Sequence, residues 1–438
     1  MPSQPPNARY AWYVVAVLSL ANVSGNVDRG VLGILVPSIE RDFHITDTQA
    51  GLLQGLAFGL FFAVLGLPIA RLADRSNRRN IIAAGAALWS VFTAASALAG
   101  SFASLLVMRI GVGVGEATLN APSVSVVADY FPRERLSRAM SVYSLGIFLG
   151  AGVGYLLGGI AFTAAGAQAS WHVPLLGGVR PWKATFLAVG APGVLVALLL
   201  LTVREPARRN VDQAGRYVSL GALFRYVGAN ARTYAAHGLG FGVFALVNYA
   251  LAFWIPALFA RTYGWNPGAA SIVQGILTMT IGVAGVVCGG WLGDRLVARG
   301  RTNGPMIVGI VGAVGMFLSA TAFTLMPTAA SAVLALAVVN FFAAFPWGAA
   351  SAAAAEMAPT TLRAQAAALY FFVLTLISGT LGPVIVGVFN QRVFGPQHIQ
   401  YSLAVTTAGG MLAAVLLLAA GLGSYQRTLV YRDAWMES

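Results

Sequence analysis

Charged residues and cysteine are both scarce in this chain, and each scarcity excludes a class of protein. Charged side chains make up 9% of the 438 residues, whereas a soluble globular protein carries roughly 25%. The mean hydropathy is +0.76, and the apolar runs are about 20 residues long, the length of a membrane-spanning helix. The chain is therefore predicted to be a polytopic helical membrane protein. Its one cysteine, Cys288, allows no intramolecular disulfide.

Lysine and histidine are scarce as well. The only lysine, Lys183, follows Trp182, so the chain has no Gly-x-x-x-x-Gly-Lys phosphate loop, which argues against an ATP-driven pump. The four histidines are scattered without the spacing of metal ligands. No set of serine, histidine and acid suggests hydrolysis. We expect no metal, no cofactor and no enzymatic activity.

The basic residues are distributed unevenly between the loops of the predicted spans. Twelve spans are predicted, at residues 10–37, 48–70, 80–100, 102–129, 137–165, 183–203, 231–260, 267–292, 305–326, 329–355, 364–389 and 401–424. Twenty of the 27 basic residues then lie on the side of the two termini, and five lie on the other side. Positive loops stay in the cytoplasm, so we expect a multi-pass protein of the plasma (cell inner) membrane with both termini cytoplasmic. The net charge of +13 is thus a topology signal, and no nucleic-acid partner is expected.

A short motif recurs at half the length of the chain. Asp74-Arg75 follows the second predicted span, and Asp294-Arg295 follows the eighth, 220 residues later. Repetition of this length is typical of transporters built from two six-span bundles. We predict an all-α fold with twelve transmembrane helices in two pseudo-symmetric six-helix bundles. The bundles comprise residues 1–204 and 231–438, and a cytoplasmic linker, 205–230, joins them with a short surface helix around Leu220 to Tyr226.

Four ionisable side chains interrupt the predicted spans of the first half. Asp28 and Arg29 lie in the first span, and Arg109 and Glu116 lie two helical turns apart on one face of the fourth. A charge at the bilayer centre costs roughly 2.5–3.5 kcal/mol, so such residues pair, line a wet cavity or move ions. We predict that the four side chains form one formally neutral network.

Three interpretations fit this network. The proton affinity of a carboxylate depends on its distance from an arginine, so Asp28 and Glu116 are candidates for proton coupling, with Arg29 and Arg109 as charge partners. Alternatively, Arg29 or Arg109 binds the anionic head group of a substrate. The third interpretation is a static salt-bridge network that holds the first and fourth spans together.

The repeated Asp-Arg loops predict a gate at the cytoplasmic ends of the helices. An acid there can face the N-terminus of a neighbouring helix, and the arginines can pair with acids at other helix ends. Such contacts can form in one conformation and break in another. The alternative is that the arginines only fix the topology. The predicted gate comprises Asp74, Arg75, Arg78 and Asp129, with Asp294 and Arg295 as counterparts in the second half.

The spans of the second half carry no mid-span charge, but they contain many aromatic and amide side chains. A charged wall opposite an aromatic wall suits an amphiphile with a polar head and an apolar tail. Aromatic residues that only pack or face lipid are the alternative. The predicted cavity-lining residues are Asn248, Tyr249, Phe253, Asn340, Phe341 and Tyr370.

Several of these motifs together resemble a known transporter family. The two Asp-Arg loops, and Arg109 with Gly113 and Gly115, are similar to signature motifs of the major facilitator superfamily. Asn26-Val27-Asp28-Arg29 and Gly113-Val114-Gly115-Glu116-Ala117 resemble its spinster-like branch. The resemblance implies a twelve-span transporter with alternating access, and its animal members imply lipid-like substrates. Gly150-Ala151 departs from the Gly-Pro of many antiporters in this superfamily.

Together, these patterns predict a secondary active transporter that moves a small amphiphilic or lipid-like organic solute by alternating access, coupled to protons. Its partners would be that substrate, protons and membrane lipid, and it would act as a monomer. The alternatives are a passive facilitator of an organic anion and a membrane receptor or sensor that binds its ligand without transporting it.

Overall fold

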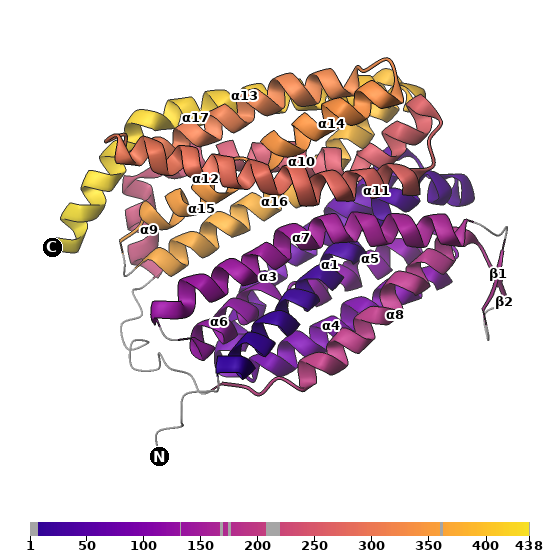
Figure 1. The fold of residues 1–438 in the computed structure, drawn as a ribbon, viewed down its shortest axis with the longest axis horizontal. Coiled ribbons are helices and arrows are strands. Elements are labelled where there is room, and N and C mark those ends of the chain that lie inside the picture. Colours follow the sequence, from indigo (N-terminus) through magenta and orange to yellow (C-terminus); the bar gives the residue numbers. More distant parts are fainter. Residues whose placement is uncertain are drawn as a thin grey trace. The chain divides into compact units, whose positions relative to one another are not determined.

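Helices occupy most of the described chain in the computed structural model (Figure 1). The structure describes residues 8–131, 133–166, 170–173, 177–206, 220–359 and 362–437, so residues 207–219 of the predicted linker lie outside it. The predicted all-α membrane fold is confirmed. The strands among the described residues form one antiparallel hairpin, in which β1 (Trp171–Val173) pairs with β2 (Gly177–Val179).

The described residues of the first half form six long helical segments, and two of these segments are interrupted. In chain order the elements are α1 (Ala8–Phe43), α2 (Asp47–Gln54) with the π segment η1 (Gly55–Leu60) and α3 (Phe61–Arg75), α4 (Arg78–Ala95) with the 3-10 turn η2 (Ser96–Leu98), α5 (Phe102–Glu116) with α6 (Asn120–Tyr130), α7 (Arg133–Ala165) and α8 (Pro181–Leu201).

The described residues of the second half repeat this order after a short helix, α9 (Leu220–Ala229), at the position where a short helix was predicted. The elements are α10 (Ala231–Tyr263), α11 (Pro267–Leu277) with the π segment η3 (Thr278–Gly282) and α12 (Val283–Ala298), α13 (Gly304–Thr324), α14 (Ala329–Ala344) with α15 (Trp347–Glu356), α16 (Arg363–Phe389) with η4 (Asn390–Phe394), and η5 (Pro396–His398) with α17 (Ile399–Glu437). Ten of the segments in the described chain are long and apolar enough to cross a membrane.

Matched interruptions divide the corresponding segments of the two halves. The π segment η1 divides the second segment and η3 divides the eighth, while the fourth breaks between α5 and α6 and the tenth between α14 and α15. The broken segments also begin alike, because the side chains of Ser101 and Ser104, and those of Thr328 and Ser331, form capping boxes at the starts of α5 and α14. π-bulges and discontinuous helices gather at functional sites in membrane transporters. These interruptions therefore direct attention to the residues beside them.

One compact unit contains the described part of Met1–Gly215 together with Phe253–Ala260 and Gly264–Ile276. Within it α1 packs along α7, and α4 lies beside α8 (Figure 1). A Cβ at Gly154 of α7 would stand 2.7 Å from the carbonyl oxygen of Asn26 on α1, so only glycine permits this approach. The last turns of α10 belong to this unit because the backbone of Phe253 packs against α1 at Gly33.

The other compact unit contains the described part of Arg216–Ala252 with Arg261–Tyr263 and Leu277–Ser438. In this unit α13 and α17 run side by side (Figure 1). The helix α9 docks through Tyr226, whose hydroxyl donates to the carbonyl of Met357 at 2.8 Å and whose ring lies 5.4 Å from that of Trp435. The two units are defined by which residues pack together. The two bundles that the repeat predicts, residues 1–204 and 231–438, stay a prediction.

Candidate functional site

The centre of the candidate site is an ion pair between α1 and the end of α5. Arg29 donates from Nε to Oε2 of Glu116 at 2.5 Å. The Glu116 side chain is fully buried, whereas that of Arg29 keeps 20% of its surface exposed. The guanidinium also lies over the rings of Phe58 in η1 and Phe62 in α3, 5.4 and 4.9 Å from their centroids. Arg29 thus joins α1, the π segment and the fourth span, and the aromatic rings add cation–π attraction.

Glycines on α5 place Glu116 beside α1. A Cβ at Gly113 would stand 2.6 Å from the carbonyl oxygen of Phe58, and one at Gly115 would stand 2.7 Å from the amide nitrogen of Trp89. These glycines therefore let α5 lie directly against η1 and α4. The α5 helix ends at Glu116, and Gly25 on α1 leaves space for its carboxylate, because a Cβ there would lie 3.5 Å from Oε2.

Asp28 is a second acid in the same region, and it is 1% exposed. It lies within electrostatic reach of Glu116, Arg109 and Arg29. Neither of its carboxylate oxygens completes a hydrogen bond of normal geometry with the described residues. A buried carboxylate without full compensation is costly. Asp28 is therefore a buried acid whose charge is incompletely compensated by the described residues.

Arg109 is 1% exposed and makes different contacts from those of Arg29. Its guanidinium lies 5.2 Å from the ring centroid of Phe186 on α8, and Nη2 donates weakly to the hydroxyl of Ser96 at 3.4 Å. Its Nε has no hydrogen-bond partner among the described residues. The four side chains predicted as a network do lie within electrostatic reach of one another. The described residues of this group contain one direct ion pair, Arg29 with Glu116.

A second ionic cluster lies within the same unit, at the start of α4. Arg78 donates from Nη1 to Asp129 at 2.5 Å and from Nε to Glu205 at 2.7 Å. Nη1 also contacts the hydroxyl of Ser125 at 2.8 Å, and the backbone amide of Arg79 donates to Glu205 at 3.0 Å. The structure thus brings together two predicted gate residues, Arg78 and Asp129. Glu205 was not predicted from the sequence as a site residue. The feature that could have indicated it is an acid at the start of an otherwise basic linker.

The other predicted gate residues do not join that cluster. The side chain of Asp74 lies outside the described part of the structure, and Arg75 is exposed at the end of α3. In the second half, Asp294 is exposed, and the guanidinium of Arg295 lies over the ring of Trp291 at 5.1 Å. A gating role for these four residues stays a prediction.

The predicted cavity-lining residues fall into separate local contacts. Asn340 accepts a hydrogen bond from Thr278, the first residue of η3, at 2.9 Å, and the ring of Tyr370 packs 4.7 Å from His237. Asn248 donates to its own helix, at the carbonyl of Phe244. Phe253 packs edge-to-face with Trp254, and Phe341 packs edge-to-face with Phe342. Tyr249 is partly buried. Their role as a cavity lining stays a prediction.

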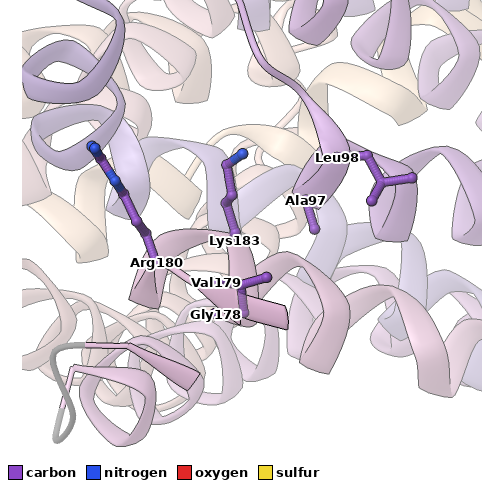
Figure 2. Close-up of a pocket in the computed structure, with 6 residues that line it drawn as sticks. All are labelled: Ala97, Leu98, Gly178, Val179, Arg180 and Lys183. Carbon is purple, nitrogen blue, oxygen red and sulfur yellow. The ribbon is translucent and has the colours of Figure 1, made fainter. Parts of the chain in front are cut away.

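A cavity of about 290 Å³ is lined by residues of the hairpin, the start of α8 and η2 (Figure 2). Its lining includes Arg180 and Lys183 but none of the predicted site residues. Asp42 at the end of α1 already pairs with Arg180 and accepts a hydrogen bond from the indole of Trp182. These contacts fasten α8 to α1, and the cavity is an edge of that junction. Among the described residues, no group of three or more histidine, cysteine or acidic side chains is arranged to hold a metal.

Matched interruptions in the two halves of the chain and acids buried within membrane spans are features of secondary transporters. Residues 18–383 match the family model of the Major Facilitator Superfamily. The chain belongs to this superfamily, and it is a transporter and not an enzyme.

Its relatives include proteins of the spinster-like branch. An MFS-type efflux pump of Mycolicibacterium smegmatis is 27% identical over 427 residues, covering 96% of this chain and 95% of the relative. Human protein spinster homolog 1 is 29% identical over 403 residues, covering 86% and 73%. The crystal structure of a bacterial homolog of the human lysosomal transporter spinster, inward-facing and unoccupied, is 27% identical, covers 97% of this chain and 99% of that one, and has a TM-score of 0.80. The family resemblance predicted from the sequence motifs is confirmed.

Proposed function

We propose that this protein is a proton-coupled secondary transporter that moves a small amphiphilic or lipid-like organic solute by alternating access. The observation that carries the proposal is the ion pair between Arg29 and the fully buried Glu116, 2.5 Å long, with Asp28 nearby. Two carboxylates at the level of a helix break can exchange protons with water that reaches them in one conformation. The protein acts in this proposal as a monomer in the plasma membrane, with both termini in the cytoplasm.

Proton uptake by Glu116 supplies the coupling step. The neutral carboxylic acid no longer attracts Arg29 as an anion does, so the tie between α1 and the end of α5 weakens. The guanidinium keeps its contacts with the rings of Phe58 and Phe62, so Arg29 can shift without losing every partner. One charge that crosses 100 mV changes the free energy by about 2.3 kcal/mol, which is enough to bias two conformations.

The surroundings of Arg29 support an amphiphilic substrate. The partly exposed guanidinium offers a charge-assisted donor for a phosphate or carboxylate head, and the neighbouring phenyl rings offer apolar surface. Relatives named as an efflux pump and as spinster proteins support an organic solute of this kind. We assign Arg78, Asp129 and Glu205 to a latch that is closed in this structure and opens during the cycle.

A second function, passive facilitation of an organic anion, is favoured by one observation. Arg109 is buried with its Nε unpartnered among the described residues, so it has a donor available for an anionic head group. In that case the acids would hold the arginines in place and would not move protons.

Proteoliposomes with an imposed pH gradient test the proposal. Ligands are first selected by thermal stabilisation of the purified protein, beginning with a fluorescent single-chain phospholipid. Wild-type protein should accelerate uptake or efflux of the selected ligand when the gradient is applied. Glu116→Gln should abolish this acceleration and spare exchange without a gradient. Asp42→Asn serves as the matched control, because Asp42 is an acid at the far end of α1 that pairs with Arg180. Equal loss of both transport modes in Glu116→Gln would favour the passive facilitator.

A further inference from the structure

Three buried polar side chains from three helices meet in the first unit. Asn22 on α1, Ser123 on α6 and Tyr143 on α7 are 4%, 0% and 2% exposed. The hydroxyl of Tyr143 lies against the side chains of Ser123 and Asn22. However, Nδ2 of Asn22, Oγ of Ser123 and the oxygen of Tyr143 complete no hydrogen bond of normal geometry with the described residues. Such convergence of under-satisfied polar atoms is costly unless a small polar molecule completes the hydrogen bonds.

The chemistry of these three groups matches water. A buried water makes about three hydrogen bonds to polar groups that would otherwise be unsatisfied. The amide of Asn22 donates, and the two hydroxyl groups of Ser123 and Tyr143 can each donate or accept. No charged side chain belongs to the trio, so the site suits a neutral molecule better than an anion. The near-complete burial of all three side chains favours a molecule no larger than water.

Residues of the trio are connected with both ionic clusters of the unit. Arg29, the arginine paired with Glu116, is within electrostatic reach of the Tyr143 hydroxyl. On the other side, α6 carries both Ser123 and Asp129, which are six residues and about 9 Å apart along a helix. Ser125 of the same helix contacts Arg78 at 2.8 Å. The helix α6 therefore carries polar groups both at the trio and at the Arg78–Asp129 pair.

We propose that Asn22, Ser123 and Tyr143 bind water and form a proton path between the Glu116 ion pair and the end of the unit marked by Arg78 and Asp129. Hydroxyl groups can pass a proton by accepting one and releasing another, so no charge has to stay on Tyr143. The charged groups around the path are Arg29 and Asp28 on α1, Glu116 on α5, and Arg78 with Asp129. This inference rests on the proposed proton coupling, and it adds a route to the residues that bind the proton.

The test follows carboxyl protonation directly, so it does not depend on the identity of the transported solute. Purified protein is moved rapidly from alkaline to acidic medium, and the infrared band of the protonated carboxyl is recorded with time. The band that Glu116→Gln removes is assigned to Glu116. Tyr143→Phe and Ser123→Ala should each slow the rise of that band by at least about tenfold. This threshold is smaller than the rate effect of about 10²–10⁴-fold that a positioned proton-transfer group contributes in catalysis. The final amplitude of the band should be unchanged.

Two controls make the result specific. Tyr234→Phe removes another buried hydroxyl that has no hydrogen-bond partner among the described residues. Tyr234 belongs to the other unit, so this variant should leave the rate unchanged. Ser90→Ala removes a buried hydroxyl that already donates to the carbonyl of Ala86 at 2.7 Å, and it should also have no effect. Thermal melting confirms that each variant is folded.

Distinct outcomes overturn distinct claims. If wild-type protein has no band that depends on Glu116, the proposed coupling through Glu116 fails, and this route fails with it. If the band is present but rises at the wild-type rate in Tyr143→Phe and Ser123→Ala, only the water path is wrong. If these variants also lose thermal stabilisation by the fluorescent phospholipid while the rate stays that of the wild type, the trio binds substrate and is not a water path.

Discussion

Arg29 on α1 and Glu116, the last residue of α5, form an ion pair beside the break in the fourth segment. The pair is asymmetric, because the Glu116 side chain is fully buried while the Arg29 side chain is 20% exposed. In the proposed cycle the arginine is the partner that moves, and the protonation state of the acid decides whether it does. Stability and transport should consequently respond differently when each partner is changed.

Removal of Arg29 should destabilise the protein more than removal of both charges. Arg29→Leu leaves the Glu116 carboxylate buried without its partner, and loss of one partner from a buried pair costs about 3–5 kcal/mol. The double variant Arg29→Leu with Glu116→Gln contains no such charge, so it should recover most of the loss. Thermal melting in detergent measures both variants. An Arg29→Leu variant as stable as the wild type would show that the pair makes no net contribution.

Loss of Arg78 should separate the start of α4 from two acids at once. Arg78→Ala leaves Asp129 and Glu205 without their guanidinium, and we expect a loss of about 3 kcal/mol in unfolding free energy. Arg78→Lys should recover only part of it, since an ammonium group cannot contact both acids with the fork geometry of arginine. The exposed Arg75 provides the control, and Arg75→Ala should change the melting temperature little. Equal effects at the two positions would contradict the assigned latch.

A methyl group at Gly113 should push α5 away from η1. The added Cβ would stand 2.6 Å from the carbonyl oxygen of Phe58, so Gly113→Ala should cost about 1–3 kcal/mol as overpacking. Gly66 on α3 has nothing within 4 Å of an added Cβ. Gly66→Ala should therefore be neutral or should stabilise by about 0.5–1 kcal/mol through helix propensity. The melting temperature of Gly113→Ala should fall while that of Gly66→Ala stays unchanged or rises, and an equal fall in both variants would argue against the close approach at Gly113.

The docking of α9 should weaken at high pH. Burial raises the pKa of Tyr226 to about 12 from its ordinary value of 10. Because the folded state disfavours the tyrosinate, the contribution of this group is complete below about pH 10 and is lost as the pH rises toward about 12. Tyr226→Phe should remove that part of the alkaline loss at the cost of the hydrogen bond to Met357, about 1 kcal/mol. Melting curves of both proteins at several alkaline pH values measure the difference, and equal alkaline losses in the two proteins would contradict the assignment to Tyr226.

The membrane fold was predictable from the sequence, and the charged side chains inside the spans were easy to single out, for a physical reason. Hydrophobic runs of fixed length and charges inside them are strong local signals. Asp28, Arg29, Arg109 and Glu116 stand out on these grounds, and the structure gathers them in one unit. Partner choice was not predictable. Which arginine reaches Glu116, and that Arg109 turns to Phe186, depend on helix rotation and on glycine contacts that arise only after packing.

The interruptions and the second ionic cluster were harder to predict. Nothing in Gly55–Leu60 breaks a helical pattern by itself, so the π segment η1 gives no clear local signal. The ion pair of Arg78 with Glu205 joins residues 127 positions apart, and a basic linker with two acids, Glu205 and Asp212, does not indicate which of them pairs with Arg78. The cluster of Asn22, Ser123 and Tyr143 is likewise invisible in sequence, because each residue is an ordinary polar side chain until three helices meet.

The helix α17 offers a practical use for imaging. It runs through 39 residues, about 58 Å at 1.5 Å per residue, whereas the hydrocarbon layer is about 30 Å thick. Its last turns pack through Tyr431 and Trp435 against Tyr226. A rigid domain spliced onto this helix in register would keep a fixed orientation to its own unit. Such a fusion would provide a small membrane protein with an alignment marker for electron cryomicroscopy.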